Sequence, residues 1–183
     1  MKHIKKTLEE ISNNFKILSD HNCEEIEQAS KLMIQSLSKG GKIIFCGNGG
    51  SAADSQHLSA ELIGRYRKNR KPLPSISLTT DTSVITCIAN DFGYEKIFER
   101  QLQGLGQKGD LLIAFSTSGN SKNIVNVLKM AKNLKIKSIS LLGNKGGLCK
   151  NISNYSYIVP SNSTANIQEV HHLIGHMFCS LVD

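Results

Sequence analysis

Two amphipathic helices are predicted within the first forty residues. In the first, over residues 4–18, apolar side chains recur at alternating steps of four and three and so share one narrow, heptad-like face. These side chains are Ile4, Leu8, Ile11, Phe15 and Leu18. Such a face either packs on its own domain or pairs with another subunit. The second helix is predicted over residues 23–38 and ends before Gly40 and Gly41.

From residue 41 onward, short apolar runs alternate with helical patterns. Five runs that end in Gly, Ser, Thr or Pro predict strands: "KIIFCG", "SISLTT", "DLLIAFS", "KSISLLG" and "YSYIVP". Helices are predicted over residues 52–66, 83–88, 121–134 and 167–181. This alternation is typical of βαβ units around a parallel sheet that is covered on both faces. We therefore predict one α/β domain over residues 1–183, a three-layer sandwich with a five-stranded parallel sheet in 41–183 and an N-terminal helical extension in 1–40.

Composition indicates a globular protein that acts inside the cell. Hydrophobic residues make up 39% and charged residues 20% of the 183 residues. No apolar run reaches the ~18 residues that a membrane span needs, and Glu9 and Glu10 interrupt any signal-peptide core. The five cysteines are scattered and form no C-x-x-C pair, which favours reduced thiols. We expect a cytoplasmic protein without a membrane partner.

The net charge of +7 raises the question of nucleic-acid binding. Lysines and arginines are, however, spread along the chain, Trp is absent, and no RNA motif with interleaved aromatic residues occurs. These features favour either attraction of anionic metabolites or a merely solvated basic surface. No nucleic-acid partner is expected.

Two loops rich in glycine and hydroxyl groups follow predicted strands, and each opens a helix. They are "GNGGS" at residues 47–51 and "STSGNS" at residues 116–121. Ligands of parallel sheets bind beyond the carboxyl ends of the strands, and a helix N-terminus stabilises an anion. Neither loop has the lysine of a Walker motif or the pattern G-x-G-x-x-G, so a small phosphorylated metabolite is favoured and no nucleotide cofactor is expected. Ordinary helix caps and tight turns remain the alternative.

Polar side chains at four-residue spacing mark two helices. His57, Glu61 and Arg65 would share one face, and so would Gln168, His172 and His176. A solvated stripe with an ion pair has the same pattern. Histidine and carboxylate are zinc ligands, but H-E-x-x-H is absent, so spacing alone indicates a metal only weakly.

Taken together, several segments resemble the sugar isomerase (SIS) domain family and, within it, the phosphoheptose isomerases. The segments are "CGNGGSAADSQHLSAELIGRYRKNR", "LTTDTS", "IANDFGYE", "STSGNS" and "IQEVHHLIGH", in the family's order and spacing over essentially the whole chain. The resemblance implies the SIS fold and the conversion of D-sedoheptulose 7-phosphate to D-glycero-D-manno-heptose 7-phosphate through an enediol. This would be the first step toward the heptose of bacterial surface glycans such as lipopolysaccharide. It also implies a homotetramer with active sites between subunits.

The resemblance assigns roles to individual residues of this chain. Glu61 and His176 match the pair that transfers protons, and one zinc ion per subunit would be held by His57, Glu61, Gln168 and His176. The residues expected to bind substrate are Asn48, Gly49, Gly50, Ser51, Glu61, Arg65, Asn90, Asp91, Ser116, Thr117, Ser118, Ser121 and Gln168. The two roles of Glu61 compete, because a carboxylate bound to a metal is a poorer base. The sequence leaves that choice open.

One departure from the family pattern and two rival functions complete the sequence picture. Asn166 stands where the family usually has arginine. A non-catalytic SIS tetramer that binds the replication initiator DnaA shares "GNGGSAA", "LTTD" and "IQE", but it lacks a histidine at the position of His176 and departs from "STSGNS". Both differences favour an isomerase. An SIS isomerase for another sugar phosphate stays open.

Overall fold

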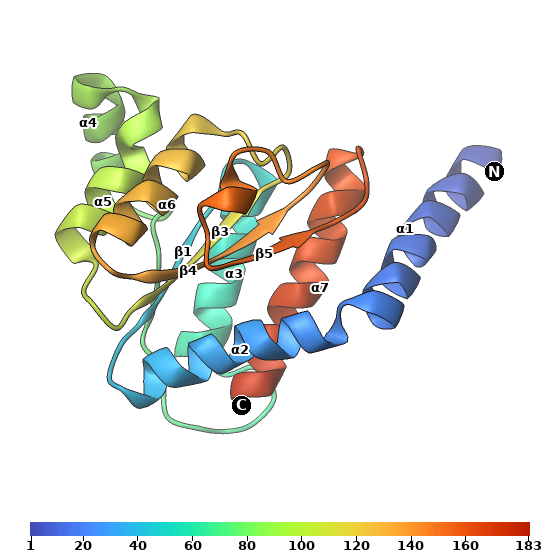
Figure 1. The fold of residues 1–183 in the computed structure, drawn as a ribbon, viewed down its shortest axis with the longest axis horizontal. Coiled ribbons are helices and arrows are strands. Elements are labelled where there is room, and N and C mark those ends of the chain that lie inside the picture. Colours follow the sequence, from blue (N-terminus) through green and yellow to red (C-terminus); the bar gives the residue numbers. More distant parts are fainter.

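The protein is described from a computed structural model that covers residues 1–183, with every side chain except those of His3 and His21. Its centre is a five-stranded parallel sheet with strand order β2-β1-β3-β4-β5 (Figure 1). The strands are β1 (Ile43–Cys46), β2 (Ser75–Ser77), β3 (Leu111–Ser116), β4 (Lys137–Leu142) and β5 (Tyr155–Ile158). The predicted α/β fold class is confirmed.

Helices cover both faces of the sheet, which gives the three layers. On one face lie α2 (Cys23–Ser38), α3 (Gly50–Ile63) and α7 (Thr164–Val182). The other face carries α4 (Thr82–Phe92), α5 (Ile97–Leu105) and α6 (Lys122–Asn133), with short 3-10 turns at Tyr94–Lys96 and Cys149–Asn151. No helix of the described chain is long and apolar enough to cross a membrane.

The two faces have separate hydrophobic cores because successive side chains of a strand point to opposite sides. Along β3, Leu111, Ile113 and Phe115 pack under α2, α3 and α7. Leu112 and Ala114 pack under α5 and α6. All six residues of β3 are buried, so the strand reads as a continuous apolar run, as expected for a parallel sheet covered on both sides.

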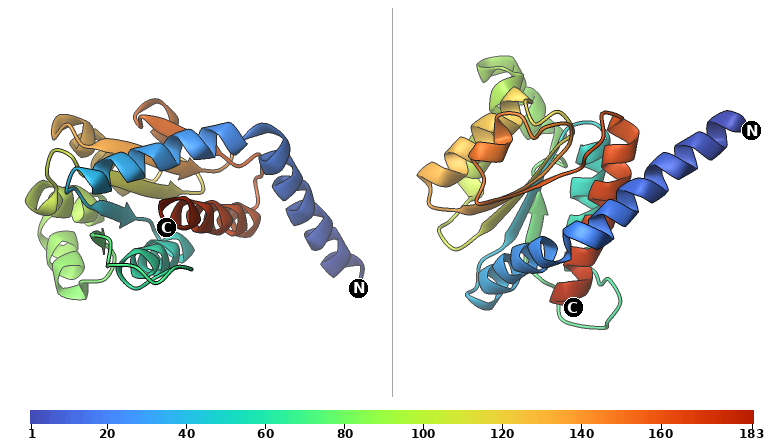
Figure 2. Two further views of the ribbon diagram at one scale, coloured as in Figure 1. Left: turned by 90° about the horizontal axis from the view of Figure 1, so that it is seen from below. Right: turned by 45° about the vertical axis from the view of Figure 1, so that its right-hand side comes forward.

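Helix α1 (Lys2–His21) extends away from the rest of the molecule (Figures 1 and 2). Only the C-terminal end of its heptad-like apolar face packs against the rest of the chain. Leu18 is 2% exposed, whereas Ile4 is 64% and Leu8 61% exposed. The seam predicted over residues 4–18 is therefore present, and most of it faces away from the chain's own core.

The helix predicted over residues 52–66 is shorter at its C-terminus than expected. It ends at Ile63, because the backbone of Gly64 leaves the helical region with φ −76° and ψ −102°. Arg65 consequently lies outside α3, exposed and in irregular chain, and the prediction that it continues the face of His57 and Glu61 is wrong.

Between β2 and β3 the chain holds more helix than the pattern predicted. Helix α4 runs over Thr82–Phe92, not only 83–88, because the Asp81 carboxylate caps its start by accepting the Val84 N–H at 2.9 Å. Gly93, with φ 91°, ends it. Helix α5 was not predicted; it is nine residues long and is held by burial of Ile97, Phe98 and Leu102.

Candidate functional site

The glycine loop at residues 47–51 connects β1 to α3 and is tied to a second helix. The side-chain amides of Asn48 and Asn123 exchange two hydrogen bonds, of 2.9 and 2.8 Å. Asn48 Oδ1, which accepts from the Asn123 amide, also accepts from the Tyr94 hydroxyl at 3.1 Å. Gly49 has φ 57°, a conformation that glycine adopts without strain. The loop is thus fixed by contacts with the opposite face of the molecule.

The serine loop at residues 116–121 connects β3 to α6 and is held mainly by its own atoms. The Ser116 hydroxyl accepts the Gly119 N–H at 3.1 Å and donates to Ser121 Oγ at 3.3 Å. Gly119 has φ 67°, and a Cβ there would lie 2.1 Å from the Gly146 carbonyl oxygen. The loop therefore lies against backbone 146–147, and only glycine fits at its centre.

The two loops lie at the same edge of the sheet because β1 and β3 are neighbouring parallel strands. Asn123, which pairs with Asn48, is the second residue of α6 and follows the serine loop directly. Ser118 is exposed at this edge, so its hydroxyl is accessible to a ligand. The edge thus offers glycine backbone, hydroxyl groups and two helix N-termini, which together suit an anion.

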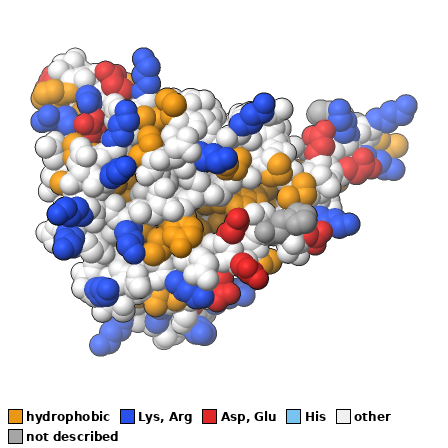
Figure 3. Space-filling model, in the orientation of Figure 1, with side chains coloured by type: hydrophobic (Ala, Val, Ile, Leu, Met, Phe, Trp, Pro, Cys, Tyr) orange, Lys and Arg blue, Asp and Glu red, His pale blue; other side chains and the backbone are white. Residues whose placement is uncertain are grey.

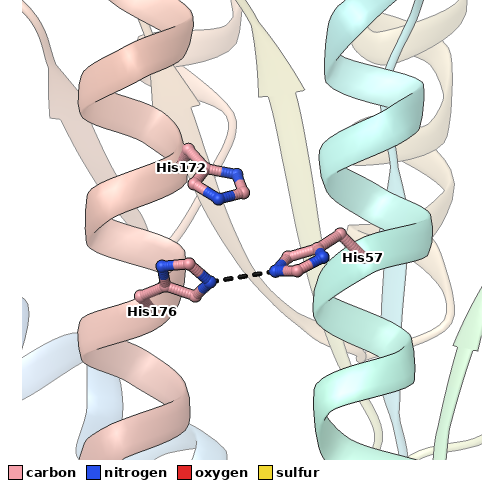
Figure 4. A group of neighbouring side chains, drawn as sticks. All are labelled: His57, His172 and His176. Atoms are coloured by element: carbon pink, nitrogen blue, oxygen red, sulfur yellow. Dashed lines mark hydrogen bonds between the residues drawn. The ribbon is translucent and has the colours of Figure 1, made fainter. Parts of the chain in front are cut away.

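A cluster of three imidazoles lies between α3 and α7 (Figure 4). His57 comes from α3, and His172 and His176 come from α7. The Nε2 atoms of His57 and His176 are 2.9 Å apart, and one ring nitrogen from each of the three residues lies within 4.8 Å of the others. Such a group could hold a metal ion.

A glycine allows the two helices to approach this closely. Gly175 lies on α7 next to His176, and a Cβ built on it would be 2.4 Å from Cδ1 of Leu58 on α3. Leu58 is itself only 1% exposed and has little room to move. Because residue 175 has no side chain, the faces of α3 and α7 that carry the histidines can come into contact.

Two carboxylates flank the imidazoles. Glu61 Oε1 lies 3.5 Å from His57 Nε2, one turn further along α3. Asp54 Oδ1 lies 2.9 Å from His172 Nδ1. The Tyr66 ring stacks on His176, with 5.3 Å between ring centroids. The cluster is half-buried, with 41% of the His57 side chain and 23% of the Glu61 side chain exposed.

Electrostatics favour a neutral imidazole at His176. Burial lowers the pKa of His176, the neighbouring His172 and His57 lower it further, and Glu61 opposes them. The adjacent His171 is a different case: burial lowers its pKa to about 4, although its hydrogen bond to the Leu142 carbonyl at 3.0 Å works the other way. His171 faces the core and takes no part in the cluster.

The fold brings some of the sequence-predicted site residues together and leaves others apart. His57, Glu61 and His176 converge between α3 and α7. Gln168 on α7 lies against Gly50 at the start of α3, where a Cβ built on that glycine would be 2.6 Å from its Nε2. Asn90 and Asp91 are exposed near the end of α4, and their described hydrogen bonds link them to each other and to Cys87, not to either loop.

Other residues of the site were given no role from the sequence. They are Asp54, Tyr66, Tyr94, Asn123 and His172. Only His172 had a signal, since it stands four residues after Gln168 and four before His176. The remaining four make contacts between segments that the sequence pattern does not relate to one another.

Comparison with known proteins gives a consistent result. The SIS domain model matches residues 8–143. A phosphoheptose isomerase of Akkermansia muciniphila is 47% identical over 181 residues, which cover 99% of this chain and 95% of that protein. A phosphoheptose isomerase of Aliarcobacter butzleri is 52% identical over 160 residues, 87% of this chain and 85% of that protein. The solved structure of a phosphoheptose isomerase from Francisella tularensis superposes with a TM-score of 0.96 at 37% identity, covering 100% of this chain and 97% of the other.

Proposed function

This chain belongs to the SIS domain family and, within it, to the phosphoheptose isomerases, and from that premise we propose that it interconverts D-sedoheptulose 7-phosphate and D-glycero-D-manno-heptose 7-phosphate. The observation that carries the proposal is the convergence of Glu61, His57 and His176 between α3 and α7, where Nε2 of His57 is 3.5 Å from Glu61 and 2.9 Å from His176. The chain thus has a carboxylate and an imidazole close to one another for proton transfer.

The phosphate of the sugar binds at the serine loop. The exposed Ser118 hydroxyl already accepts the Asn120 N–H at 3.1 Å, which leaves its own hydrogen free to donate to a phosphate oxygen. Thr117 and Ser121 add two further hydroxyls, and the N-terminus of α6 adds its partial positive charge. Ser116 supports the loop from within by accepting the Gly119 N–H.

Glu61 and His176 carry out the isomerisation. Glu61 removes a proton from C1 of the ketose, a C1=C2 double bond forms, and His176 gives a proton to the oxygen on C2. Glu61 then returns its proton to C2, while His176 takes the hydroxyl proton from the oxygen on C1 as the C1 carbonyl forms. Positioned acid–base groups of this kind typically contribute about 10²–10⁴-fold each.

Zinc is the metal proposed for the imidazole cluster. The side chains of the cluster are chemically suited to zinc, because neutral imidazoles and a carboxylate are its usual ligands. Burial and the neighbouring histidines lower the pKa of His176, which favours the neutral form that binds a metal. His57, Glu61 and His176 would hold it, with Gln168 as the fourth position that the resemblance implies. A bound zinc ion would polarise the carbonyl oxygen of the sugar.

The rival functions have less support. A DnaA-binding adaptor needs neither the histidine at position 176 nor an intact serine loop, and this chain has both. The relatives compared above carry the name phosphoheptose isomerase, which favours a seven-carbon sugar over another sugar phosphate. We place the reaction in the cytoplasm, in accord with five free cysteines, as the first step toward heptose of a surface glycan such as lipopolysaccharide.

A homotetramer with active sites between subunits is proposed from the surface of the N-terminal helices. Ile4 and Leu8 are exposed on the projecting α1, and beside α1 lies a recess of about 490 Å³ lined largely by apolar side chains of α1, α2 and α7. Figure 3 shows apolar side chains reaching from the middle of this face toward α1. Light scattering of the protein and of Leu8→Lys tests the assembly; a tetramer unaffected by the lysine would rule out this seam as its interface.

The isomerase is tested by incubating the purified protein with sedoheptulose 7-phosphate and measuring the aldose product. His176→Ala is run beside the wild type, each with and without a chelator. Turnover by the wild type that is lost in His176→Ala supports the proposal. If the wild type shows no turnover with zinc or any other divalent metal added, the isomerase proposal fails, and a DnaA pull-down then tests the adaptor.

A further inference from the structure

Two adjoining hollows lie at the amino-terminal ends of β3 and β4, at the edge of the sheet opposite to the glycine and serine loops. The first has a volume of about 400 Å³ and lies between the C-terminal part of α2 and the turn before β3. The second, of about 380 Å³, lies between the C-terminal end of α6 and the segment before β5. Lys135 and Lys137 line both hollows. Each hollow is large enough for a small metabolite.

Positive charge surrounds the two hollows. The lysines that line them are all exposed: Lys39, Lys108, Lys132, Lys135 and Lys137. Figure 3 shows Lys and Arg side chains in the lower left of this face, with no Asp or Glu among them. Among the described residues that line the hollows, Asp110 is the single carboxylate. Its side chain is 4% exposed and accepts from Lys42 Nζ at 2.6 Å, so its charge is already compensated.

Lys135 occupies a backbone position that ordinarily belongs to glycine. Its φ is 57°, and the other described non-glycine residue with a positive φ is Asn144, a residue type that tolerates this region. Lys135 follows the C-cap of α6 in a Schellman motif, in which the Ile136 N–H donates to the Ala131 carbonyl at 2.8 Å. Glycine would satisfy the same motif with less strain. A lysine thus stands between the hollows at a cost to stability, as expected where its side chain has a function.

Neutralisation of helix ends does not account for all of this charge. Lysines near a helix C-terminus interact favourably with its dipole, and Lys39 and Lys132 lie at the ends of α2 and α6. Lys108 lies in the turn before β3 and Lys137 is the first residue of β4, so neither belongs to a helix. The ion pairs in the described part of the chain include none of the five lysines. A bound anion would therefore relieve their mutual repulsion.

We propose that this edge of the sheet is a second binding site, which takes a small metabolite with two phosphate groups. Lysine binds phosphate as a point charge, and lysines around two adjoining hollows suit an anion with more than one charged group. Asn154 also lines the second hollow; its Oδ1 accepts the Ser138 N–H at 2.8 Å, which leaves its NH₂ group available as a donor. The site is remote from the serine loop and does not depend on the proposed isomerase activity.

The shape and lining of the hollows favour a small anion over a nucleic acid. Single-stranded nucleic acids bind where bases stack on aromatic side chains beside a basic groove. Among the described residues that line either hollow, none is aromatic. The lysines surround concave surfaces, which can enclose a small molecule.

Isothermal titration calorimetry at low salt tests the site with three probes: inorganic pyrophosphate, fructose 1,6-bisphosphate and inorganic phosphate. The first two distinguish linked from separate phosphate groups, and at least one of them should bind more tightly than inorganic phosphate. Lys135→Gly and Lys137→Gln should each weaken that binding by about 3–5-fold, as expected for the loss of an exposed ion pair. Binding should also weaken as the salt concentration is raised.

Three controls accompany these variants. Lys5→Gln removes a charge from the projecting α1, and Ser118→Ala removes a hydroxyl from the serine loop; both should leave the affinity within about 2-fold. Lys135→Gly should melt at or above the temperature of the wild type, because glycine suits the positive φ. Weaker binding by that variant would then not be due to unfolding.

Lysine acetylation followed by peptide mass spectrometry locates the bound anion. The tighter probe should slow acetylation of Lys135 and Lys137 and leave that of Lys5 unchanged. Binding that falls in Ser118→Ala but not in Lys135→Gly would place the anion in the serine loop and overturn the proposal. Failure of both two-phosphate probes to bind would also overturn it. So would binding of a single-stranded RNA oligonucleotide, lost in Lys135→Gly, by a protein that binds neither probe.

Discussion

The serine loop and the imidazole cluster are built in opposite ways. The loop at residues 116–121 is held by groups close in sequence, such as Ser116 with Gly119, and by the neighbouring backbone at 146–147. The cluster is assembled from side chains 119 residues apart on α3 and α7. In the loop most groups already have partners among the loop's own atoms, whereas in the cluster the rings of His57, His172 and His176 lie against one another.

Under the proposed function, this difference would assign phosphate binding and proton transfer to separate parts of the molecule. A loop whose hydrogen bonds are already made needs no rearrangement to receive a phosphate, so it contributes mainly to affinity. Imidazoles that face one another can exchange their mutual contact for a metal or a substrate, so we expect the cluster to contribute mainly to the reaction. Substitutions in the loop should therefore change KM, and substitutions in the cluster should change kcat.

The largest expected effect is that of Glu61→Gln. The amide cannot remove a carbon-bound proton, so kcat should fall by about 10²–10⁴-fold while KM changes little. Steady-state kinetics with sedoheptulose 7-phosphate measure both. Full activity of this variant would exclude Glu61 from the mechanism.

Gly175→Ala disrupts the contact between α3 and α7 but changes no polar side chain. The added methyl group would meet the buried Leu58 side chain and push α3 from α7, which should lower stability by about 1–3 kcal/mol and weaken zinc binding. Urea denaturation and chelator competition measure the two effects. Wild-type zinc affinity in this variant would contradict the role we give to the helix contact.

Gly119→Ala makes the corresponding change in the serine loop. Both the positive φ and the Gly146 carbonyl oppose a side chain there, so stability should fall by about 1–3 kcal/mol and KM should rise more than kcat falls. Gly104→Ala is the control: this glycine lies in α5 with no atom within 4 Å of its Cβ position, and its replacement should stabilise by about 0.5–1 kcal/mol. Equal stability changes in the two variants would refute the argument.

Ser118→Ala removes one hydroxyl from the proposed phosphate site. Losing a single hydrogen bond worth about 0.5–1.5 kcal/mol should raise KM by roughly 2–10-fold with kcat nearly unchanged. Ser38→Ala, which removes an exposed hydroxyl at the end of α2, is the matched control. If both variants had the same KM as the wild type, the phosphate would have to bind elsewhere.

Asp183→Asn should have the smallest effect on activity, because the residue belongs to neither region. Burial alone would raise the pKa of the Asp183 side chain, but the N–H groups of Arg67 and Lys68 and the Arg70 guanidinium outweigh it and lower the pKa to about 2. A depressed pKa adds stability above the unfolded-state value near 4, and this contribution is lost as the pH falls toward 2. Urea midpoints should therefore differ between variant and wild type at pH 7 and converge at pH 2; a constant difference would contradict this account.

Much of the fold follows from the sequence because the signals are local. The buried strands read as continuous apolar runs, and glycine and hydroxyl residues mark the ends of β1 and β3. Predictions failed where one residue outweighed a pattern: Gly64 ends α3 before Arg65, so the expected three-residue face is cut to His57 and Glu61. Helix α5 went unpredicted because its nine residues are stabilised by burial more than by a long periodic pattern.

The sequence by itself determined the five strands, most of the helices and the two loops. It also determined the polar faces of α3 and α7, since four-residue spacing decides which side chains share a face of a helix. Spacing on one helix does not determine which other helix it meets, or how closely. Only the tertiary structure decided that Gly175 lets α7 approach Leu58, that His172 joins His57 and His176, and that Asp54 holds His172. These contacts depend on the packing of both helices against one sheet, which no local pattern specifies.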